Sequence, residues 1–299
     1  MTAQAFFTWA GGPATSALGL ALRLAAGFLL SAGIAWLGYR RQSLSQSGLY
    51  GAVLVGSVIF GCGGWTWGLL LIAFFVTSSA LSHYRAGRKQ ALLDHYAKGG
   101  RRDLGQALAN GGLGAMLAVW FAVGAGEQPL LFLAFAGAMA AVNADTWGTE
   151  LGVLSRRRPR LISTLQPVEP GTSGAVSWLG LAASLLGAWL IGFLALAFAL
   201  LQGWLSGAPH SPRLGWLPLV AGLGGLAGSL FDSLLGATLQ ATYYCMHCGR
   251  ETEQSMHGCG RQPIHVRGWH WLSNDWVNLL ASLAGALVAA GLGALVLHV

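Results

Sequence analysis

The amino-acid sequence predicts an all-α fold: a polytopic bundle of about eight transmembrane helices, with one small loop that carries cysteine and histidine. Composition is the first indication, because 54% of the 299 residues are hydrophobic and only 9% are charged, whereas soluble domains carry about 25% charged residues. The hydrophobic residues also form runs of about 20, the length that crosses a bilayer as a helix. The 45 glycines are scattered through these runs, as expected where membrane helices pack closely. We therefore expect residues 1–299 to form a single integral membrane domain.

Eight segments are apolar and long enough to span a bilayer. They cover residues 14–38, 47–63, 65–83, 105–126, 129–147, 174–201, 216–240 and 274–298. Only Gly61 to Gly64 separate the second segment from the third, so this pair is either a tight hairpin or one broken element. The start of the chain lacks the basic stretch of a cleavable signal peptide.

The basic residues predict the orientation of the bundle, because lysine and arginine collect in short cytoplasmic loops. Fifteen of the 17 basic residues fall in the connections after the first, third, fifth and seventh segments. Of the others, Arg213 lies in an opposite loop and Arg23 lies within the first segment. These loops are therefore expected in the cytoplasm and both termini outside. Topology alone accounts for the net charge of +7, so we expect no binding of nucleic acid.

Acidic and amide side chains approach the predicted cytoplasmic half of the membrane in three places. These are NADTWGTELG at 143–152, GSLFDSLLGATLQ at 228–240 and WLSNDWVNLL at 271–280. Ionisable groups inside a membrane are costly and usually functional, and carboxylates suit Mg²⁺. We expect Mg²⁺ at Asp145, Glu150 and Asp232, with Asp275 as a fourth catalytic candidate. The neutral candidates for nucleotide or phosphate contact are Asn143, Thr146, Ser233, Asn274 and Asn278.

Helical geometry divides the first of these clusters. On an ideal helix Asn143, Thr146 and Glu150 share one face, whereas Asp145 points nearly opposite. Either the helix ends there or Asp145 belongs to a separate wall. A structural alternative is that the carboxylates hold helices together through ion pairs, for example with Arg23.

Two further stretches on the same side suit phosphate. The loop at 82–112 mixes cations with glycines, and the stretch at 171–180 precedes a helix N-terminus, where backbone N–H groups are available to anions. The candidate phosphate-binding residues are Lys98, Arg101, Arg102, Asn110, Gly171, Thr172 and Gly174. The alternative for each arginine is that it fixes topology or contacts anionic lipid headgroups.

The predicted loop at 241–272 contains a candidate zinc site. Cys245, Cys248, His257 and Cys259 supply three thiolates and one imidazole, a set that forms closed tetrahedral zinc sites. The His-x-Cys spacing is tight, and His247 is a competing ligand. Reduced thiols without metal, or redox chemistry, are the alternatives.

Several segments together resemble a family of integral membrane proteins long labelled as a domain of unknown function, which includes the chloroplast phytyl-phosphate kinase of tocopherol synthesis. They are KGGRRDLGQALANGG, NADTWGTELGVLS with the following PRLISTLQPVEPGTSGAVSWLGLAASLLGA, GSLFDSLLGATLQATYYC and WLSNDWVNLLASLAGA. The resemblance covers most of residues 47–299. This family is related more distantly to CTP-dependent polyprenol kinases and to phosphatidate cytidylyltransferases.

The resemblance implies phosphoryl transfer from a nucleoside triphosphate such as CTP to an isoprenoid monophosphate held in the bilayer. The residues agree with this chemistry, because a monophosphate is already ionised near neutral pH, with a second pKa of about 6, and needs no general base. One rival is a lipid cytidylyltransferase, which would use the same groups and release pyrophosphate. Another is a transporter or flippase that uses the intramembrane acids.

Overall fold

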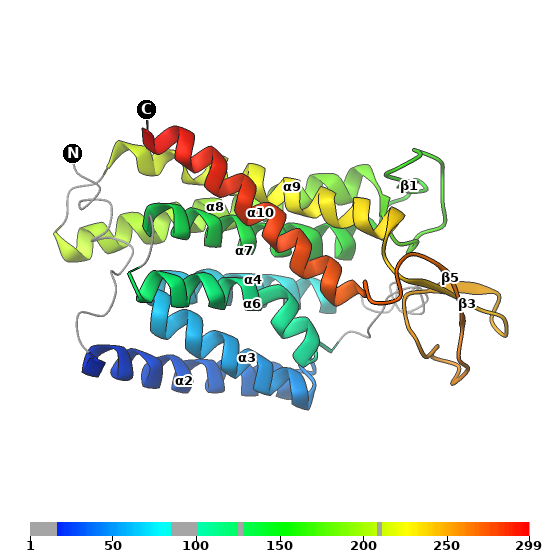
Figure 1. The fold of residues 1–299 in the computed structure, drawn as a ribbon, viewed down its shortest axis with the longest axis horizontal. Helices are drawn as coiled ribbons and strands as arrows, with labels where there is room; N and C mark the ends of the chain where they lie inside the picture. The colour runs from blue at the N-terminus through cyan, green and yellow to red at the C-terminus, as the bar shows by residue number, and fades with distance from the viewer. Residues whose placement is uncertain (1–16, 85–100, 125–127, 208–210, 299) are drawn as a thin grey trace.

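The computed structural model describes residues 17–84, 101–124, 128–207 and 211–298. Within these ranges, eight helices are long and apolar enough to cross a membrane. The predicted class and the predicted number of spans are thus confirmed. The helices run alongside one another as a bundle, with the small strands gathered at one end (Figure 1).

Most helical boundaries lie within about three residues of the predicted ones. The fourth span ends at Ala122 instead of 126, the fifth ends at Gly152 instead of 147, and the sixth covers Trp178–Ser206 instead of 174–201. The spanning elements are α2 (Ala17–Arg40), α3 (Gln46–Val58) with the π-helical turn η1 (Ile59–Gly63), α4 (Trp65–His83), α6 (Leu104–Ala122), α7 (Gln128–Gly152), α8 (Trp178–Ser206), α9 (Leu217–Thr238) and α10 (Asn274–His298). A short 3₁₀ helix, η3 (Pro212–Trp216), leads into α9.

The second and third spans form a tight hairpin, which was one of the two alternatives. The helix α3 widens into the π-helical turn η1, and Gly64 alone connects η1 to α4. Gly64 has a φ of 87°, a backbone conformation that glycine adopts without the steric penalty of a Cβ atom. The chain can therefore reverse direction within a single residue.

The helix α7 is the centre of the bundle. It packs against α4, α6, α8, α9 and α10, and Figure 1 shows it between these neighbours. Its side chains Phe132, Phe135 and Met139 are fully buried. Trp67 of α4 stacks on Phe135 with a distance of 4.3 Å between ring centroids, so aromatic packing fills the bundle on that side.

Glycines let α9 and α10 approach α7 closely. A Cβ atom on Gly285 of α10 would lie 2.7 Å from the Cβ of Ala141, 2.9 Å from the carbonyl oxygen of Gly137 and 3.1 Å from that of Gly224. Three backbones thus meet at one level, as small residues allow in membrane bundles.

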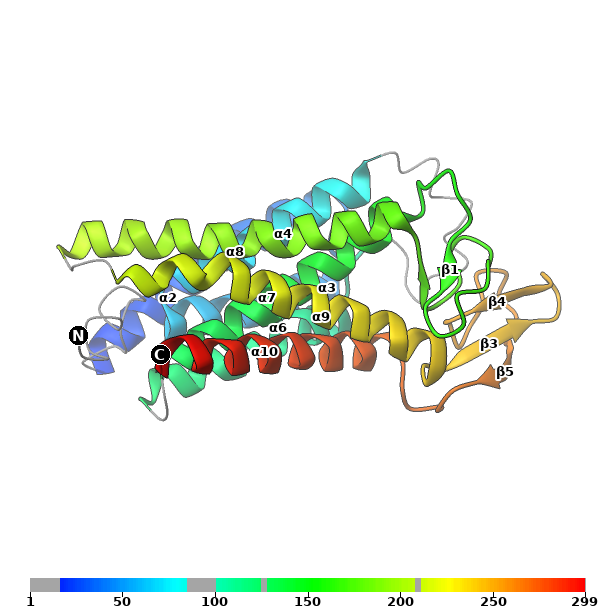
Figure 2. The ribbon, with the colours of Figure 1, turned by 90° about the horizontal axis from the view of Figure 1, so that it is seen from above.

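Both ends of the described chain lie at the same end of the bundle, as an even number of spans requires. The opposite end carries two small antiparallel sheets, which the all-α prediction did not include (Figure 2). One pairs β1 (Arg160–Leu161) with β2 (Ala175–Val176), and the other has the order β4-β3-β5. Its strands are β3 (Thr242–Cys245), β4 (Arg250–Thr252) and β5 (Ile264–Arg267). Placement of this end in the cytoplasm stays a prediction from the basic residues.

Substitution of Gly285 by alanine should destabilise the bundle, because the added methyl group overlaps two helices that cannot both move away. Overpacking of this kind costs about 1–3 kcal/mol. The matched control is Gly291→Ala on the same helix, where a Cβ atom meets nothing within 4 Å. We expect a lower melting temperature in detergent for Gly285→Ala, measured by tryptophan fluorescence, and an unchanged or higher one for Gly291→Ala, since alanine favours a helix. Equal melting temperatures would contradict the proposed packing.

Candidate functional site

The helix α7 carries two groups of polar side chains on opposite faces. Towards α4, the hydroxyl of Ser82 donates to Glu150 Oε1 at 2.6 Å and that of Thr77 donates to Asn143 Oδ1 at 3.0 Å. On the other face, Asp145 interacts electrostatically with carboxylates outside α7. Since α7 continues to Gly152, the helix does not end at Asp145. The second alternative therefore holds, and Asp145 belongs to a separate wall.

Two of the residues predicted to contact phosphate form hydrogen bonds within the helix bundle instead. Asn143 is completely buried, and its Nδ2 donates to the carbonyl oxygen of Gly187 on α8 at 2.8 Å. With its bond to Thr77, the Asn143 amide joins three helices. The hydroxyl of Thr146 donates to the carbonyl oxygen of Val142 within α7. We therefore assign these two residues to the scaffold.

Three carboxylates gather on the α9 side of α7. Asp232 of α9 interacts electrostatically with Asp145 and with Glu253, and Asp145 also interacts with Glu253. The Oδ2 atom of Asp232 is buried and has no hydrogen-bond partner among the described residues. A buried carboxylate oxygen without a partner is costly unless a cation or a donor approaches it, so this acidic cluster is suited to a positively charged ligand.

The composition of the acidic cluster differs from the predicted magnesium set. The sequence predicts Asp145, Asp232 and Glu150, but the structure places Glu150 on the opposite face of α7, bonded to Ser82. The third carboxylate of the cluster is instead that of Glu253, the residue that follows β4. The sequence around it, ETEQ, carries no spacing signal; only the tertiary fold brings Glu253 within electrostatic range of Asp145 and Asp232.

The carboxylates of the acidic cluster do not lie close enough together to surround a metal ion. Among the described residues, the Cys/His cluster is the one group of acidic, cysteine and histidine side chains with at least three ligand atoms within 4.8 Å of one another. The three carboxylates are thus too far apart to enclose an ion directly. Mg²⁺ is usually held by one or two carboxylates together with substrate phosphates and water, so an open set of this kind fits a metal–phosphate complex.

The ion-pair alternative with Arg23 finds no support. Arg23 lies on α2, which packs mainly against α3 and η1. Within the described part of the chain, the charged partners identified for Asp145 and Asp232 are carboxylates.

Arg102, which precedes α6 in the chain, lies near Glu150 on the face of α7 that is turned towards α4. Its Nη1 donates to the hydroxyl of Ser79 at 3.0 Å. Burial lowers the pKa of Arg102, and the nearby negative charge of Glu150 acts in the opposite direction. A partly desolvated guanidinium with several N–H donors is a good ligand for phosphate.

The remaining predicted residues gather at the same end of the bundle. Gly174, with a φ of 76°, packs against the backbone of Ala237 at the end of α9, and Ser173 donates to Gln240 at 3.3 Å. The segment with Gly171 and Thr172 therefore lies against the end of the helix that carries Asp232. Four further candidates are half-buried: Ser233 of α9, and Asn274, Asp275 and Asn278 of α10. Asn110 is half-buried and Arg101 is exposed, whereas Lys98 lies outside the described residues.

The four predicted zinc ligands come together beside the sheet. The Sγ atoms of Cys245 and Cys259 are 3.7 Å apart, and His257 Nδ1 lies 3.7 Å from Cys248 Sγ and 3.1 Å from Cys259 Sγ. A tetrahedral zinc ion with ordinary bond lengths would require about 3.8 Å between sulfurs and about 3.6 Å between sulfur and nitrogen. The Cys/His cluster therefore has the donors and the spacing of a metal site.

The position of His247 and the pKa values of two of the thiols bear on the ligand set. His247 is exposed and lies outside the group, which removes it as the competing ligand. The backbone N–H of Cys248 chiefly lowers the pKa of Cys245, whereas the pKa of Cys248 is raised to about 11 because its thiol donates to Cys259. The neighbouring sulfurs thus make it harder for all three thiols to lose their protons. A bound divalent cation would favour the thiolate forms.

Comparison with known proteins identifies the family. Residues 29–286 match the family described as Integral membrane protein DUF92. The chain belongs to this family. The matched region includes the acidic cluster and all four residues of the Cys/His cluster.

Relatives of this DUF92 protein occur in plants and archaea. Protein PGR of Arabidopsis thaliana is 37% identical over 273 residues, which cover 87% of this chain and 93% of the relative. An uncharacterized membrane protein of Methanocaldococcus jannaschii is 28% identical over 89% of this chain and 93% of its own. Protein VTE6, chloroplastic, of Arabidopsis thaliana is 26% identical over 82% of this chain and 64% of its own. No solved structure matches.

Removal of one ligand should empty the proposed zinc site. We expect the purified DUF92 protein to contain about one zinc ion per chain, because a site of this type has four protein ligands and no open position. His257→Ala and Cys248→Ser should each lose the metal, measured by mass spectrometry of the elements, and each should lower the melting temperature since ligation orders the loop. His247→Ala is the matched control and should keep both. Full zinc content in Cys248→Ser would refute the assignment.

Proposed function

We propose that this protein is a membrane-embedded kinase that transfers a phosphoryl group from a nucleoside triphosphate, CTP in the first instance, to an isoprenoid monophosphate. The product is the isoprenoid diphosphate. The observation that carries the proposal is the acidic cluster of Asp145, Asp232 and Glu253 at the loop end of the bundle, with Arg102 at the same end across α7. The resemblance to the family of the chloroplast phytyl-phosphate kinase supports the choice of substrate. By the distribution of basic residues, this end faces the cytoplasm.

Positioning and charge are the main demands of phosphoryl transfer. When bound, Mg²⁺ would neutralise charge on the nucleotide phosphates, and Asp145 and Asp232 are the residues that would hold it. Arg102 lies across α7 from these acids, and its charge would attract phosphate groups to this end of the bundle. Because the phosphate of the lipid is already ionised near neutral pH, the site needs no general base.

The two rivals give different products. In a cytidylyltransferase the same residues would direct attack at the α-phosphate, and the γ-phosphate would leave in pyrophosphate. CTP labelled in the γ-phosphate therefore separates them: a labelled lipid indicates a kinase, and labelled pyrophosphate indicates the rival. Movement of lipid or solute in proteoliposomes without nucleotide would instead favour a transporter.

Asp145→Asn and Asp232→Asn should each abolish transfer to lipid. The substitution preserves side-chain size and removes the charge that would hold the metal, at a cost of at least about 3 kcal/mol in transition-state stabilisation, or about a hundredfold in rate. The matched control is Glu169→Gln, which removes an exposed carboxylate that pairs with Arg158 at 3.5 Å, and it should keep full activity. The measurement is lipid diphosphate formed from labelled CTP.

Melting temperatures separate catalysis from structure in these variants. If the acids repel one another, each asparagine should leave the melting temperature unchanged or raise it. If they pair with a buried cation instead, neutralisation costs about 3–5 kcal/mol and lowers it. Near-normal synthesis of lipid diphosphate by either variant would end the proposal for that residue.

Glu253→Gln tests the carboxylate that replaces Glu150 in the acidic cluster. We expect a fall in rate of about tenfold, corresponding to about 1.4 kcal/mol, because the half-buried Glu253 acts through charge at longer range. Glu251→Gln is the matched control, an exposed carboxylate two residues away on β4. Both variants should retain their zinc, which excludes unfolding of the loop. A Glu253→Gln variant as active as Glu251→Gln would remove Glu253 from the site.

A further inference from the structure

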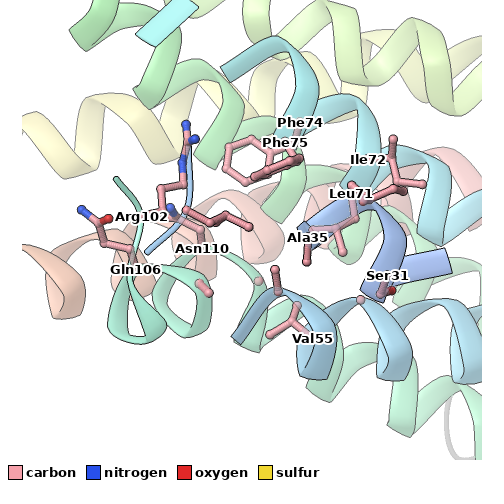
Figure 3. A pocket seen from close by; sticks show the side chains of 16 residues that line it. Ser31, Ala35, Val55, Leu71, Ile72, Phe74, Phe75, Arg102, Gln106 and Asn110 are labelled. Carbon is pink, nitrogen blue, oxygen red and sulfur yellow. The ribbon is translucent and has the colours of Figure 1, made fainter. Parts of the chain in front are cut away.

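The groove between α2, α3, α4 and α6 is too small for a lipid chain. Its wall is mostly apolar, and Arg102, Gln106 and Asn110 gather at one end (Figure 3). Its volume of about 80 Å³ lies below the range of about 300–1,000 Å³ that is usual for small-molecule sites. Apolar contact with a partner is therefore expected on the outside of the bundle.

Exposed tryptophans mark two levels on that outside. At the loop end they are Trp36 of α2, Trp178 of α8 and Trp276 of α10, and at the opposite end they are Trp120 of α6, Trp204 of α8 and Trp216 of η3. Tryptophan collects at both interfaces of a membrane, where its ring lies at the level of the headgroups. On α8, Trp204 follows Trp178 by 26 residues, or about 39 Å. This distance fits about 30 Å of hydrocarbon with part of the headgroup layer on each side.

The tryptophan at the start of α10 belongs to a larger group. The ring centroid of Trp271 lies 6.5 Å from that of Trp276 and 5.5 Å from that of Trp269, and all three side chains are at least half exposed. Trp276, Leu283 and Leu287 are exposed at spacings of seven and four, which place them on one face of α10. The tryptophan cluster of Trp269, Trp271 and Trp276 is therefore continuous with the lipid-facing side of this span.

The backbone of the tryptophan cluster is fixed to the end of the bundle. The N–H of Trp269 donates to the carbonyl oxygen of Leu239 at 2.9 Å, and the N–H of Ala241 donates to that of Leu272 at 2.9 Å. The side chain of Leu272 is buried. The outward position of Trp269 and Trp271 is thus a property of an ordered segment.

The strand β5, which precedes the tryptophan cluster, has its apolar side chains on the outside. Ile264 and Val266 are more than half exposed, whereas His265 and Arg267 are half-buried. Arg267 donates inwards to backbone carbonyl oxygens at the end of α9. A strand with one face in water normally has its apolar residues inside and its polar residues outside. The reversed pattern of β5 fits an outer face that meets an apolar layer.

We propose that the tryptophan cluster and the neighbouring part of β5 enter the headgroup layer of the bilayer, so that the β5 edge of the sheet rests on the membrane. Val266 precedes Trp269 by three residues, which span at most about 11 Å of chain, and it therefore lies close to the level that Trp276 marks. The occupant of this surface is the phospholipid layer itself. The inference does not depend on the proposed kinase activity.

The sheet order sets the depth. Because the order is β4-β3-β5, one side of β5 has no neighbouring strand in the described sheet. Unpaired backbone groups are costly in hydrocarbon but can bond to water and to headgroups. Indole rings suit the same layer, since each has an apolar body and one N–H donor. Contact at the level of the headgroups therefore satisfies both the strand and the tryptophans.

Depth-dependent fluorescence quenching tests the proposal on the full-length protein in nanodiscs with a single chain per disc and no nucleotide. A fluorescent amino acid replaces Val266 or, as the matched control, Glu169, which is exposed in the connection between α7 and α8. At 266 we expect stronger quenching by a nitroxide lipid labelled near its headgroup than by one labelled near the end of its chain, and weak quenching by iodide. At 169 we expect strong quenching by iodide. Unchanged melting temperatures verify folding.

Three outcomes would overturn the proposal. The first is iodide quenching at 266 as strong as at 169, which would place β5 in water. The second is protection from iodide that requires two chains per disc, which would indicate a second copy as the partner. The third is protection that requires CTP, which would indicate a nucleotide on the tryptophan cluster.

Trp271→Ser tests the part of the tryptophan cluster. This substitution removes the ring that contacts both other tryptophans, so iodide quenching of the probe at 266 should rise. Trp178→Ser is the matched control, because it removes an exposed tryptophan of the same level from another helix, and it should leave the quenching unchanged. Equal quenching in the two variants would contradict anchoring by the cluster.

Discussion

The absence of water inside a bilayer is the constraint on which this structure depends, because every polar group placed there must find a partner in the protein or in a ligand. The helix α7 brings Asn143, Asp145 and Glu150 into that environment within about two turns. Neighbouring helices satisfy two of them: Asn143 bonds to α4 and α8, and Glu150 bonds to α4. Asp145 instead faces other acids, and the glycines that bring α9 against α7 place Asp232 beside it. The structure thus provides hydrogen-bond partners for Asn143 and Glu150 but leaves the two aspartates together. A cationic ligand would explain this arrangement.

The loop that carries the Cys/His cluster connects this candidate zinc site to the acidic cluster. Glu253 lies between β4 and His257, so the same short segment supplies one carboxylate and one metal ligand. Arg267 of β5 donates to the carbonyl oxygens of Gly236 and Ala237 at the end of α9, which anchors the sheet on the helix that carries Asp232. Ordering of the loop by metal would therefore fix the position of Glu253 relative to the two intramembrane acids. The sheet is thus held on the end of α9 by hydrogen bonds to backbone carbonyl oxygens.

Much of the fold was predictable because apolar length and glycine content are local properties. The eight spans and the four candidate ligands of the Cys/His cluster follow from spacing along the chain, whereas the structure decided between a hairpin and a broken element at Gly64 and between His257 and His247. Helical periodicity also separated Asp145 from Asn143 and Glu150 correctly. It could not show which neighbour each face meets, and the structure places Glu150 apart from Asp145 and Asp232, where it accepts from Ser82 of α4. The position of Glu253 depends on tertiary packing, which leaves no periodic signal in the sequence.

Packing along α7 also bears on the choice between an enzyme and a transporter. Alternating access requires a path that opens to each side of the membrane in turn around a site near its middle. The acidic cluster lies towards the loop end, and above it Phe132, Phe135 and Met139 of α7 are completely buried against Trp67 of α4 and other core side chains. Interiors packed in this way resist continuous deformation, so a path past these residues would require repacking of the central helix. A reaction at one membrane face, by contrast, needs only that a lipid head and a soluble phosphate donor meet at one end of the bundle, the end towards which the acidic cluster lies.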